Sequence, residues 1–365
     1  MGFEKREIVV VGAGVIGLSI AHELAEANYK VIVIASHFPT DPLSSRYTSS
    51  WAGAHFRPFP LVQPHDKRER LYSLVTLEKF TRMSQQEPES SIRMIKGIEY
   101  LEDPSKEYIM DSGYSDGIKD FRKLSKYELP DEDVKLGTEY ETWCVNAPHY
   151  LLYLYNKLKF KYGVEFVKQE LNCLKQVFYF YPNISGIVNA TAFGLQYDGS
   201  YDPLCYPIRG QTLLIRAPLN KQCRYENQTI TRQTKDGKWS FIIPRPINGG
   251  IILGGTKQLD ILDTKPRLQD TEQLIELGKK FFPELLIENP NTGEKFFDIQ
   301  HINVGFRPAR KSGSRVELEK IIDNERNLNK FIVHAYGVGG MGYEVSFGIA
   351  SKVVSLVEAG RLSKL

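Results

Sequence analysis

The sequence has 365 residues, of which 42% are hydrophobic and 25% are charged. This length gives room for two or three domains with buried cores, and the composition excludes a disordered chain, a collagen and a disulfide-stabilised miniprotein. The formal net charge of +3, with no dense basic block, argues against general nucleic-acid binding. The four cysteines lie far apart, without a Cys-x-x-Cys pair or a Cys/His metal spacing, which indicates reduced thiols and no metal site.

The two ends of the chain predict its location. No stretch approaches the roughly 18 consecutive apolar residues of a membrane span. The first apolar run, residues 8–11, is too short for the core of a signal peptide. We therefore expect no membrane partner. The chain ends in Ser363-Lys364-Leu365, the tripeptide read by the peroxisomal import receptor. The sequence thus predicts a peroxisomal matrix protein that binds this receptor.

The N-terminal residues predict a strand at 7–11, a glycine-rich turn at 12–17, a helix at 18–27 and a second strand at 30–35. Apolar runs of β-branched residues are typical of buried parallel strands, and two such runs about 20 residues apart indicate a βαβ unit.

The rest of the chain mixes helices and strands. Residues 58–130 are polar and mixed, with a helix over 71–83. Further helices are expected at 149–162, 271–282 and 345–358, and strands at 164–168, 186–190, 212–217, 240–243, 251–253 and 331–335. This order predicts an α/β fold whose nucleotide-binding domain is assembled from both chain ends, with a β-rich domain inserted. The expected boundaries are 1–57, 140–206 and 300–365 for the first domain, and 58–139 and 207–299 for the second.

The pattern Gly12-x-Gly14-x-x-Gly17 follows the first strand and opens the first helix. Its glycines permit a tight turn and close approach of the backbone to a pyrophosphate, which the helix N-terminus attracts. It predicts a dinucleotide cofactor. The acid that usually binds the ribose at the end of the second strand is missing; Ser36 and His37 stand there instead. Ser36 offers one hydrogen bond, and NADP is left open.

Three later stretches suit a ligand site. Residues 48–58 combine hydroxyls, small residues and an aromatic, as a backbone that passes flat against a large ring system requires. Arg307 and Arg310 flank a proline after a strand, and guanidinium groups capture carboxylates in two-pronged geometry. The glycine-rich loop 337–342 opens the last helix, whose N-terminus stabilises negative charge.

With these stretches and four further motifs, the chain resembles the D-amino acid oxidase family over nearly its whole length, and most closely the fungal branch and the relatives selective for acidic D-amino acids. The four motifs are Arg209-Gly210-Gln211, Ile242-Ile243-Pro244-Arg245-Pro246, Leu253-Gly254-Gly255-Thr256 and His334-Ala335-Tyr336-Gly337. The resemblance implies a Rossmann-type FAD-binding domain like that of p-hydroxybenzoate hydroxylase, with an inserted β-rich substrate domain. It also implies oxidation of a D-amino acid by hydride transfer to flavin N5, with O2 as second substrate and a 2-oxo acid, ammonia and hydrogen peroxide as products. A homo-oligomer is left open.

The resemblance also implies roles for individual residues. Arg307 matches the residue that clamps the substrate α-carboxylate, and Gly340 the residue whose carbonyl holds the α-amino group. The cofactor-binding positions are Gly12, Ala13, Gly14, Val15, Ile16 and Gly17 at the pyrophosphate, Ser36, Thr48, Ser49, Gly53 and Leu171, and, around the flavin, Gly339, Gly342, Tyr343 and Glu344.

Four residues match the pocket for the substrate side chain: His55, Arg57, Phe241 and Lys257, of which all but Phe241 are cationic or potentially cationic. Lys257 follows Gly-Gly-Thr where acid-selective relatives carry Arg, and Phe241 replaces a Tyr. A cation 4 Å from a second carboxylate gains about 4 kcal/mol at an effective dielectric constant of ~20, before desolvation. The expected substrates are therefore D-aspartate and D-glutamate. The alternatives are an oxidase of neutral D-amino acids, with Lys257 and Arg57 in solvent, a flavin-binding protein without turnover, and a nicotinamide dehydrogenase.

Overall fold

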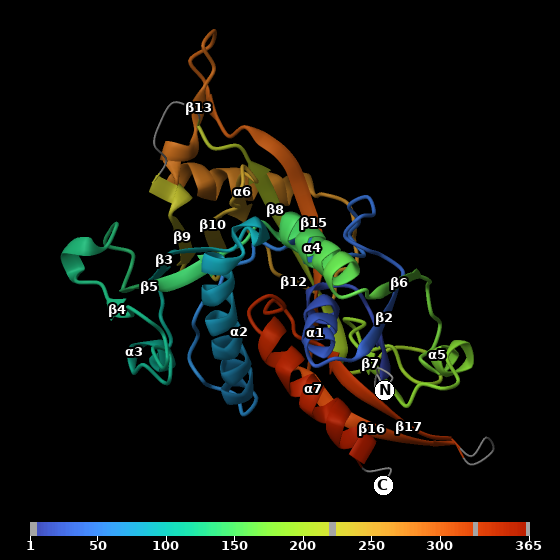
Figure 1. Ribbon diagram of the computed structural model, residues 1–365. Helices are drawn as coiled ribbons and strands as arrows, with labels where there is room; N and C mark the ends of the chain where they lie inside the picture. The colour runs from blue at the N-terminus through green and yellow to red at the C-terminus, as the bar shows by residue number, and fades with distance from the viewer. Residues whose placement is uncertain (1–5, 219–223, 324–327, 363–365) are drawn as a thin grey trace.

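The computed structural model describes residues 6–218, 224–323 and 328–362. The terminal Ser363-Lys364-Leu365 therefore lies outside the described residues. Two large sheets with their covering helices make up the fold (Figure 1). The predicted α/β class is confirmed.

The first sheet has six strands in the order β16-β17-β7-β1-β2-β6. All neighbours are parallel except the β16–β17 pair. Successive residues of β1 face opposite sides: Ile8 and Val10 pack among α1 and α7, and Val9 packs beside α5. Burial on both faces explains the unbroken apolar run of β1. The elements are β1 (Glu7–Val11), α1 (Val15–Glu26), β2 (Lys30–Ala35), α4 (Ala147–Asn156), β6 (Glu165–Lys168), α5 (Lys175–Phe180), β7 (Gly186–Asn189), β16 (Arg315–Asp323), β17 (Leu328–Tyr336) and α7 (Ser346–Leu362).

The second sheet has nine strands, in the order β12-β8-β11-β10-β9-β3-β5-β4 with β15 paired to β8. Leu213 and Leu253 of this sheet pack with Leu274 of α6 in a core of its own. The elements are β3 (Arg93–Leu101), β4 (Arg122–Lys123), β5 (Leu136–Cys144), β8 (Cys205–Ile215), β9 (Gln228–Gln233), β10 (Trp239–Pro244), β11 (Ile251–Gly254), β12 (Gln258–Leu259), α6 (Leu268–Phe281) and β15 (Ile299–Arg310).

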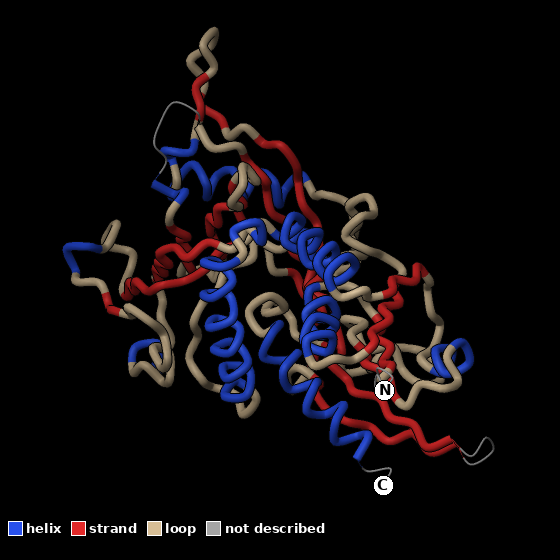
Figure 2. Tube along the Cα trace, in the orientation of Figure 1, coloured by secondary structure: helices blue, strands red, loops and turns tan. Residues whose placement is uncertain are grey.

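The remaining elements are α2, which contacts α7, and short pieces (Figure 2). They are α2 (Asp66–Gln86), α3 (Lys106–Ile109), the small sheet of β13 (Ile287–Glu288) and β14 (Lys295–Phe296), the 3-10 turns η1 (Thr48–Trp51), η2 (Pro88–Ser90), η3 (Lys126–Glu128), η5 (Arg224–Glu226) and η6 (Pro283–Leu285), and the π turn η4 (Lys157–Lys161).

The predicted strands at 7–11 and 30–35 match β1 and β2 residue for residue. The helix expected at 149–162 stops at Asn156 and continues as the π turn. Strand β3, in the region that the sequence describes as polar, and strand β5, which follows that region, were missed because charged residues such as Lys96, Glu139 and Glu141 interrupt their apolar runs.

The expected domain division differs from the sheets at three places. Residues 140–144, 205–206 and 300–310, assigned to the cofactor-binding domain, pair within the nine-stranded sheet as parts of β5, β8 and β15. Strand β15 pairs with β8 from Ile299 to Arg310, and the next strand, β16, joins the other sheet. The chain therefore crosses between the sheets after Arg310, which a strand pattern alone does not reveal.

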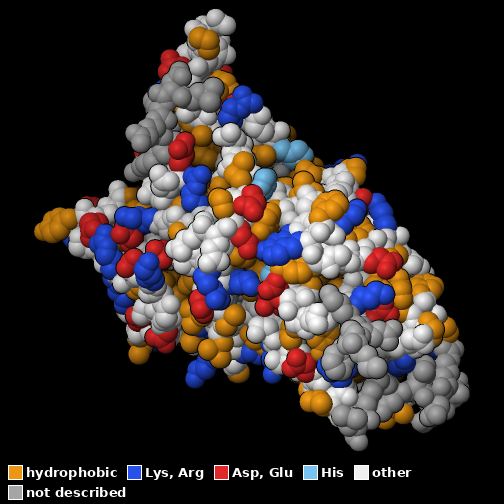
Figure 3. Space-filling model, viewed as in Figure 1, with side chains coloured by type: hydrophobic (Ala, Val, Ile, Leu, Met, Phe, Trp, Pro, Cys, Tyr) orange, Lys and Arg blue, Asp and Glu red, His pale blue; other side chains and the backbone are white. Residues whose placement is uncertain are grey.

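Positive and negative side chains are interspersed on the face shown in Figure 3. Within residues 6–218, 224–323 and 328–362, no helix has both the length and the apolar character to cross a membrane. The three described cysteines, Cys144, Cys173 and Cys205, carry free thiols, as predicted.

Candidate cofactor and substrate site

A cavity of about 870 Å³ is lined by residues of both large sheets. Such a volume lies in the upper range of small-molecule and cofactor sites. With one exception, every residue that the sequence nominates for cofactor or substrate binding lines it. The exception is Gly17.

The glycine turn after β1 is shaped by close backbone contacts. Gly12 has a positive φ of 108°, and a Cβ atom there would lie 2.3 Å from the Ala190 carbonyl oxygen. A Cβ atom on Gly17 would lie 1.9 Å from the Gly12 carbonyl oxygen, so Gly17 permits the turn to pack rather than facing the cavity. The amide of Val15 donates to Ser49 Oγ at 3.0 Å. The first turn of α1 is thereby presented to the cavity.

An acidic side chain reaches the cavity near the end of β2, although not from β2 itself. Strand β6 pairs in parallel with β2, with Lys168 opposite Ala35. Glu170 and Leu171 follow β6 and line the cavity together with Ser36. Parallel strands end at the same edge of a sheet, so a carboxylate lies near the end of β2, although it is exposed and paired with Arg46 at 2.5 Å. Glu170 could not be identified from the sequence, because the pairing of β6 with β2 is not visible in the chain order.

The segment at η1 is tied to the glycine turn, to β15 and to the last loop. Thr48 Oγ1 donates to the Phe306 carbonyl at 2.8 Å, and Tyr343 Oη donates to the Ser49 carbonyl at 2.9 Å. A Cβ atom on Gly53 would lie 2.6 Å from Ile243 Cδ1, so a larger residue would require the Ile243 side chain to move. These contacts agree with the expected flat backbone wall.

Arg245 of the Pro-Arg-Pro motif supports the same segment of backbone through hydrogen bonds. Arg245 Nη2 donates to the Ala52 carbonyl at 2.7 Å and to the Ser50 carbonyl at 3.3 Å. Burial lowers the pKa of Arg245 to about 10. Arg245 does not line the cavity itself, and its contacts fix the wall in place.

The glycine-rich loop before α7 packs against the Arg307 side of the cavity. The Gly339 amide donates to the Pro308 carbonyl at 2.8 Å. A Cβ atom on Gly340 would lie 3.4 Å from Arg307 Cδ. The predicted pair Arg307 and Gly340 is therefore brought together.

Glu344 is a carboxyl group without a full set of partners. Its Oε2 atom is buried and has no hydrogen-bond partner within the described chain. Burial raises the pKa of Glu344 to about 8, even though the nearby Arg57 and Arg70 and the Arg57 amide act in the opposite direction. Glu344 is thus mostly protonated at pH 7 and offers the cavity a neutral O–H donor.

Arg307 is a half-buried cation that no acid neutralises within residues 6–218, 224–323 and 328–362. It lies opposite Ile208 on β8, where Gly210 leaves the room: a Cβ atom there would lie 2.6 Å from Arg307 Nη1. Nη1 donates to the Thr256 carbonyl at 3.2 Å. Burial lowers the pKa of Arg307. An anion that enters the cavity would relieve this desolvation.

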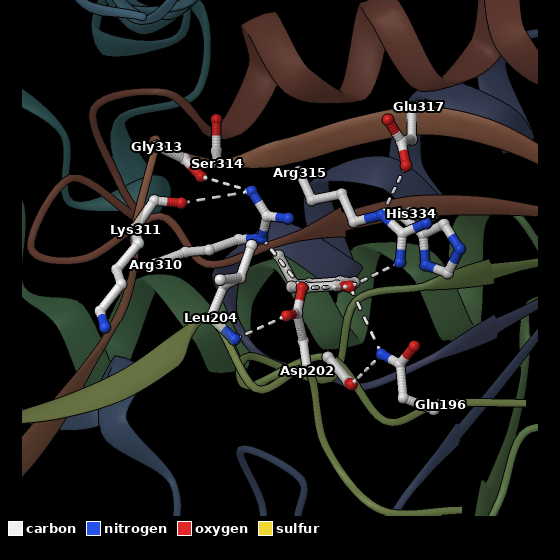
Figure 4. Close-up of polar contacts among 12 residues, drawn as sticks. Gln196, Asp202, Leu204, Arg310, Lys311, Gly313, Ser314, Arg315, Glu317 and His334 are labelled. Carbon is white, nitrogen blue, oxygen red and sulfur yellow. Dashed lines mark hydrogen bonds and ion pairs between the residues drawn. The ribbon is translucent and has the colours of Figure 1, made fainter. Parts of the chain in front are cut away.

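Arg310 has the opposite environment. Its Nε donates to Asp202 Oδ2 at 2.9 Å, and the same oxygen accepts from Tyr336 at 2.9 Å (Figure 4). Its Nη1 reaches the Lys311 and Gly313 carbonyls. Arg310 is therefore a structural residue, in contrast to Arg307.

Arg57 lines the cavity but does not offer it a free charge, which corrects the expectation. Its Nη1 pairs with Oε1 of the fully buried Glu99 at 2.5 Å and contacts Tyr108 Oη at 3.3 Å. The guanidinium lies over the Trp239 ring, 4.7 Å from the centroid. The Glu99 charge raises the pKa of Arg57 above its usual value. Glu99 has no recognisable signal in the sequence, because it lies on the missed strand β3.

His55 is not a cation at neutral pH, and this also corrects the expectation. The Thr229 hydroxyl donates to the Ile242 carbonyl at 2.8 Å, so its oxygen accepts from His55 Nδ1–H at 3.1 Å. Burial and the charge of Arg57 lower the pKa of His55 to about 3. In the free protein, His55 is a neutral imidazole with its lone pair on Nε2.

Lys257 is the predicted side-chain cation that keeps its charge free. It lines the cavity, and the structure shows no ion pair or hydrogen bond of its ammonium group within the described residues. Its side chain is exposed overall, and desolvation at the cavity, with the charges of Arg307 and Arg57, lowers its pKa. Phe241 lies next to it, with its ring against Gly254 and Gly255.

His65, Asp66 and Glu69 place ligand-type atoms within 4.8 Å of one another at the start of α2. Two of them already accept hydrogen bonds: Asp66 Oδ2 accepts one from the Val62 amide, and Glu69 Oε1 accepts one from the Ser314 amide. These bonds account for the cluster as a connection between α2 and two loops.

The residues of the cavity fit FAD. Gly12, Gly14 and the first turn of α1 line the cavity, where a helix N-terminus suits a phosphate, and Gly53 lines it beside η1. Glu344 Oε2 is buried without a hydrogen-bond partner in the described chain, which leaves a polar position for the cofactor. Ser36, Glu170 and Leu171 would hold the adenosine end, the turn 12–16 the pyrophosphate, and Thr48, Ser49, Gly53, Gly339, Gly342, Tyr343 and Glu344 the flavin end.

Comparisons with known proteins agree with an FAD cofactor. Residues 7–356 match the family described as FAD dependent oxidoreductase, DAO. The chain is 38% identical to a D-aspartate oxidase of Talaromyces thermophilus, over 98% of this chain and 96% of that protein. It is 35% identical to a D-amino-acid oxidase of Schizosaccharomyces pombe, over 97% and 96%.

Solved structures share the fold at low identity. An L-proline dehydrogenase from P. horikoshii has a TM-score of 0.70 at 18% identity, with 98% of this chain and 94% of that chain covered. A glycine oxidase from Geobacillus kaustophilus has a TM-score of 0.69 at 16% identity, with 97% and 95% covered. Fold, cavity and sequence lead to one conclusion: the chain belongs to the DAO family of FAD-dependent oxidoreductases.

Proposed function

We propose that this enzyme oxidises D-amino acids with acidic side chains to 2-oxo acids, with release of ammonia and hydrogen peroxide. The observation that carries the proposal is a pair of unneutralised cations, Arg307 and Lys257, on one cavity. D-aspartate and D-glutamate bring two carboxylates, which match these two charges. The relative from Talaromyces thermophilus, named for D-aspartate, supports this choice.

The roles of the residues follow from their chemistry. Arg307 holds the α-carboxylate in two-pronged geometry, and the Gly340 carbonyl beside it accepts a hydrogen bond from the α-amino group. Two such contacts fix the direction of the Cα–H bond and remove the orientational entropy of the reaction. FAD supplies the two-electron acceptor that O2 regenerates. Lys257 attracts the second carboxylate, and Phe241 excludes water from the same side.

The direct test mixes the flavin-loaded enzyme anaerobically with D-aspartate, D-glutamate, D-alanine or L-aspartate. We expect the flavin absorbance to bleach fastest with the two acidic D-amino acids and not with L-aspartate. Bleaching led by D-alanine would favour the neutral oxidase. No bleaching with any D-amino acid would favour a flavin-binding protein without turnover, and bleaching by a reduced nicotinamide alone would favour the dehydrogenase.

The proposal includes the subcellular location of the protein. The terminal Ser363-Lys364-Leu365 supports recognition by the import receptor and a place in the peroxisomal matrix, where hydrogen peroxide is removed. Deletion of these three residues should leave activity intact and move a fluorescent fusion to the cytosol. An unchanged distribution of the fusion protein would contradict the proposed peroxisomal location.

His37→Asp tests the adenosine end of the site. A carboxylate at the end of β2 is expected to bind a ribose hydroxyl by a charge-assisted hydrogen bond and lower the dissociation constant of FAD about fivefold, or ~1 kcal/mol. Fluorescence titration of the apoprotein measures it, with His37→Asn as the uncharged control. An unchanged constant would show that Glu170 and Ser36 already satisfy the ribose.

Glu344→Gln tests, in the protein without cofactor, whether the pKa of Glu344 is raised. The folded pKa of about 8 lies above the usual 4.5, so the unfolded chain ionises first. The stability of the wild type is fully present below pH 4.5 and is lost as the pH rises toward 8, by at most about 1.4 kcal/mol per pH unit. Glutamine does not titrate. The apoprotein's free energy of unfolding, measured from pH 4 to 9, should fall relative to Glu344→Gln within this window, and a constant difference would refute the raised pKa.

A further inference from the structure

Arg209, the first residue of the Arg-Gly-Gln motif, is fully buried in β8 and uses all five of its N–H groups. The function proposed above assigns it no role. Its Nε donates to the Asp263 carbonyl at 2.8 Å, Nη1 to Gln258 Oε1 at 2.7 Å and Asp270 Oδ2 at 2.9 Å, and Nη2 to the Lys265 carbonyl at 2.7 Å and Gln211 Oε1 at 3.0 Å.

Four of these acceptors lie in one segment, residues 258–270, which runs from β12 to the first turn of α6. Lys257 directly precedes the segment. Leu262 and Thr264 within it line the cavity. Because two of the bonds go to main-chain carbonyls, Arg209 holds the path of the segment and not only its side chains.

The next two residues of the motif reach the other cation. Gly210 leaves the space that the Arg307 guanidinium occupies. The Gln211 amide donates to Thr256 Oγ1 at 2.8 Å, and the Thr256 amide donates to the Gln211 carbonyl at 3.1 Å. The Thr256 carbonyl in turn accepts from Arg307 at 3.2 Å. Three consecutive residues of β8 therefore connect the surroundings of Arg307 with those of Lys257.

We propose that Arg209 is a positioning residue that fixes Lys257 relative to Arg307 and thereby sets the preference for acidic side chains. The inference rests on the substrate class proposed above. A flexible stem such as that of Lys257 loses rotamer freedom when it pairs with a carboxylate, so the placement of its backbone decides how much of the charge interaction is realised. Arg209 touches neither substrate nor cofactor and acts through the segment 258–270.

The first test is Arg209→Lys in the flavin-loaded enzyme. Lysine keeps the charge but has three donors without the planar fork, so it cannot satisfy all five acceptors. We expect KM for D-aspartate and D-glutamate to rise about tenfold, whereas kcat, and KM for D-alanine, should stay within about twofold. The matched control is Arg232→Lys, another buried arginine of the same sheet, whose partners Glu102 and Asp131 are unconnected with the cavity.

A second variant and a second measurement keep the test decisive. Asp270→Asn removes one charged partner of Arg209 without changing its shape, and is expected to act in the same direction by about threefold. Hydrogen–deuterium exchange of the holoenzyme should increase in residues 258–267 for both variants and not for Arg232→Lys. Unchanged exchange there, or increased exchange with an unchanged ratio of acidic to neutral kcat/KM, would overturn the proposal.

If Arg209→Lys fails to fold, the Asp270→Asn results decide. A wild type that does not prefer acidic substrates would refute the proposed substrate class, and would be seen before any variant is made. The exchange data would still decide whether Arg209 holds the segment.

Discussion

Arg307→Ala is expected to lower kcat/KM for every D-amino acid substrate at least ~100-fold, equivalent to about 2.7 kcal/mol of transition-state stabilisation. Arg307 is a half-buried cation that no acidic residue neutralises in the described chain, and it lies beside Gly340 on the cavity. Without its fork, the α-carboxylate would enter the cavity unpaired, which costs several kcal/mol in desolvation. The Cα–H bond would also lose its fixed direction, so kcat should fall together with the rise in KM.

Arg310→Ala provides the matched control three residues along the same strand. Arg310 is bonded to Asp202 and two carbonyls (Figure 4), so its loss should lower the melting temperature but leave kcat/KM within about threefold. Steady-state kinetics with D-aspartate and D-alanine separates the two variants. Near wild-type efficiency in Arg307→Ala, with flavin content unchanged, would remove Arg307 from the carboxylate role.

The parts of the site that the sequence predicts are those built from consecutive residues. The strand, turn and helix around Gly12 can be predicted because their apolar run and glycines stand in one continuous stretch, although Gly12 packs against the distant Ala190. The same holds for Gly53 and for the loop at Gly339, whose small residues stand in one stretch of chain. Their positions on the cavity agree with expectation.

The charge state of the site could not be predicted, because it depends on contacts between distant strands. Arg57 looks like a free cation until β3 brings the buried Glu99 against it. His55 looks titratable near neutral pH until burial and Arg57 lower its pKa. Glu170 reaches the cavity near the end of β2 only because β6 pairs with β2. In each case the residue type was visible in the sequence and its partner was not.

This revised charge balance leads to the second large prediction. Of the three cations that the sequence nominates for the substrate side chain, only Lys257 keeps a free charge. Lys257→Met should therefore raise KM for D-aspartate and D-glutamate by about 30-fold, or ~2 kcal/mol, roughly half of the Coulomb energy at an effective dielectric constant of 20. KM for D-alanine should change less than about twofold, since it has no second carboxylate. Lys238→Met, at a lysine away from the cavity, is the control.

His55→Ala should raise KM for the same substrates less than Lys257→Met does, because a neutral imidazole contributes a hydrogen bond and packing rather than a charge.

The pH dependence of KM distinguishes Lys257 from His55. A lysine loses its charge as the pH rises through its pKa, and burial moves the pKa of Lys257 down, so KM for acidic substrates should begin to rise below the usual lysine range. Lys257→Met should abolish this rise. In the free enzyme, His55 is already neutral above pH 3, so kcat/KM for acidic substrates should show no inflection near 6.5. An inflection there that disappears in His55→Ala would restore His55 as the cation, and a wild type that prefers D-alanine or D-methionine about tenfold would replace the acidic assignment with the neutral one.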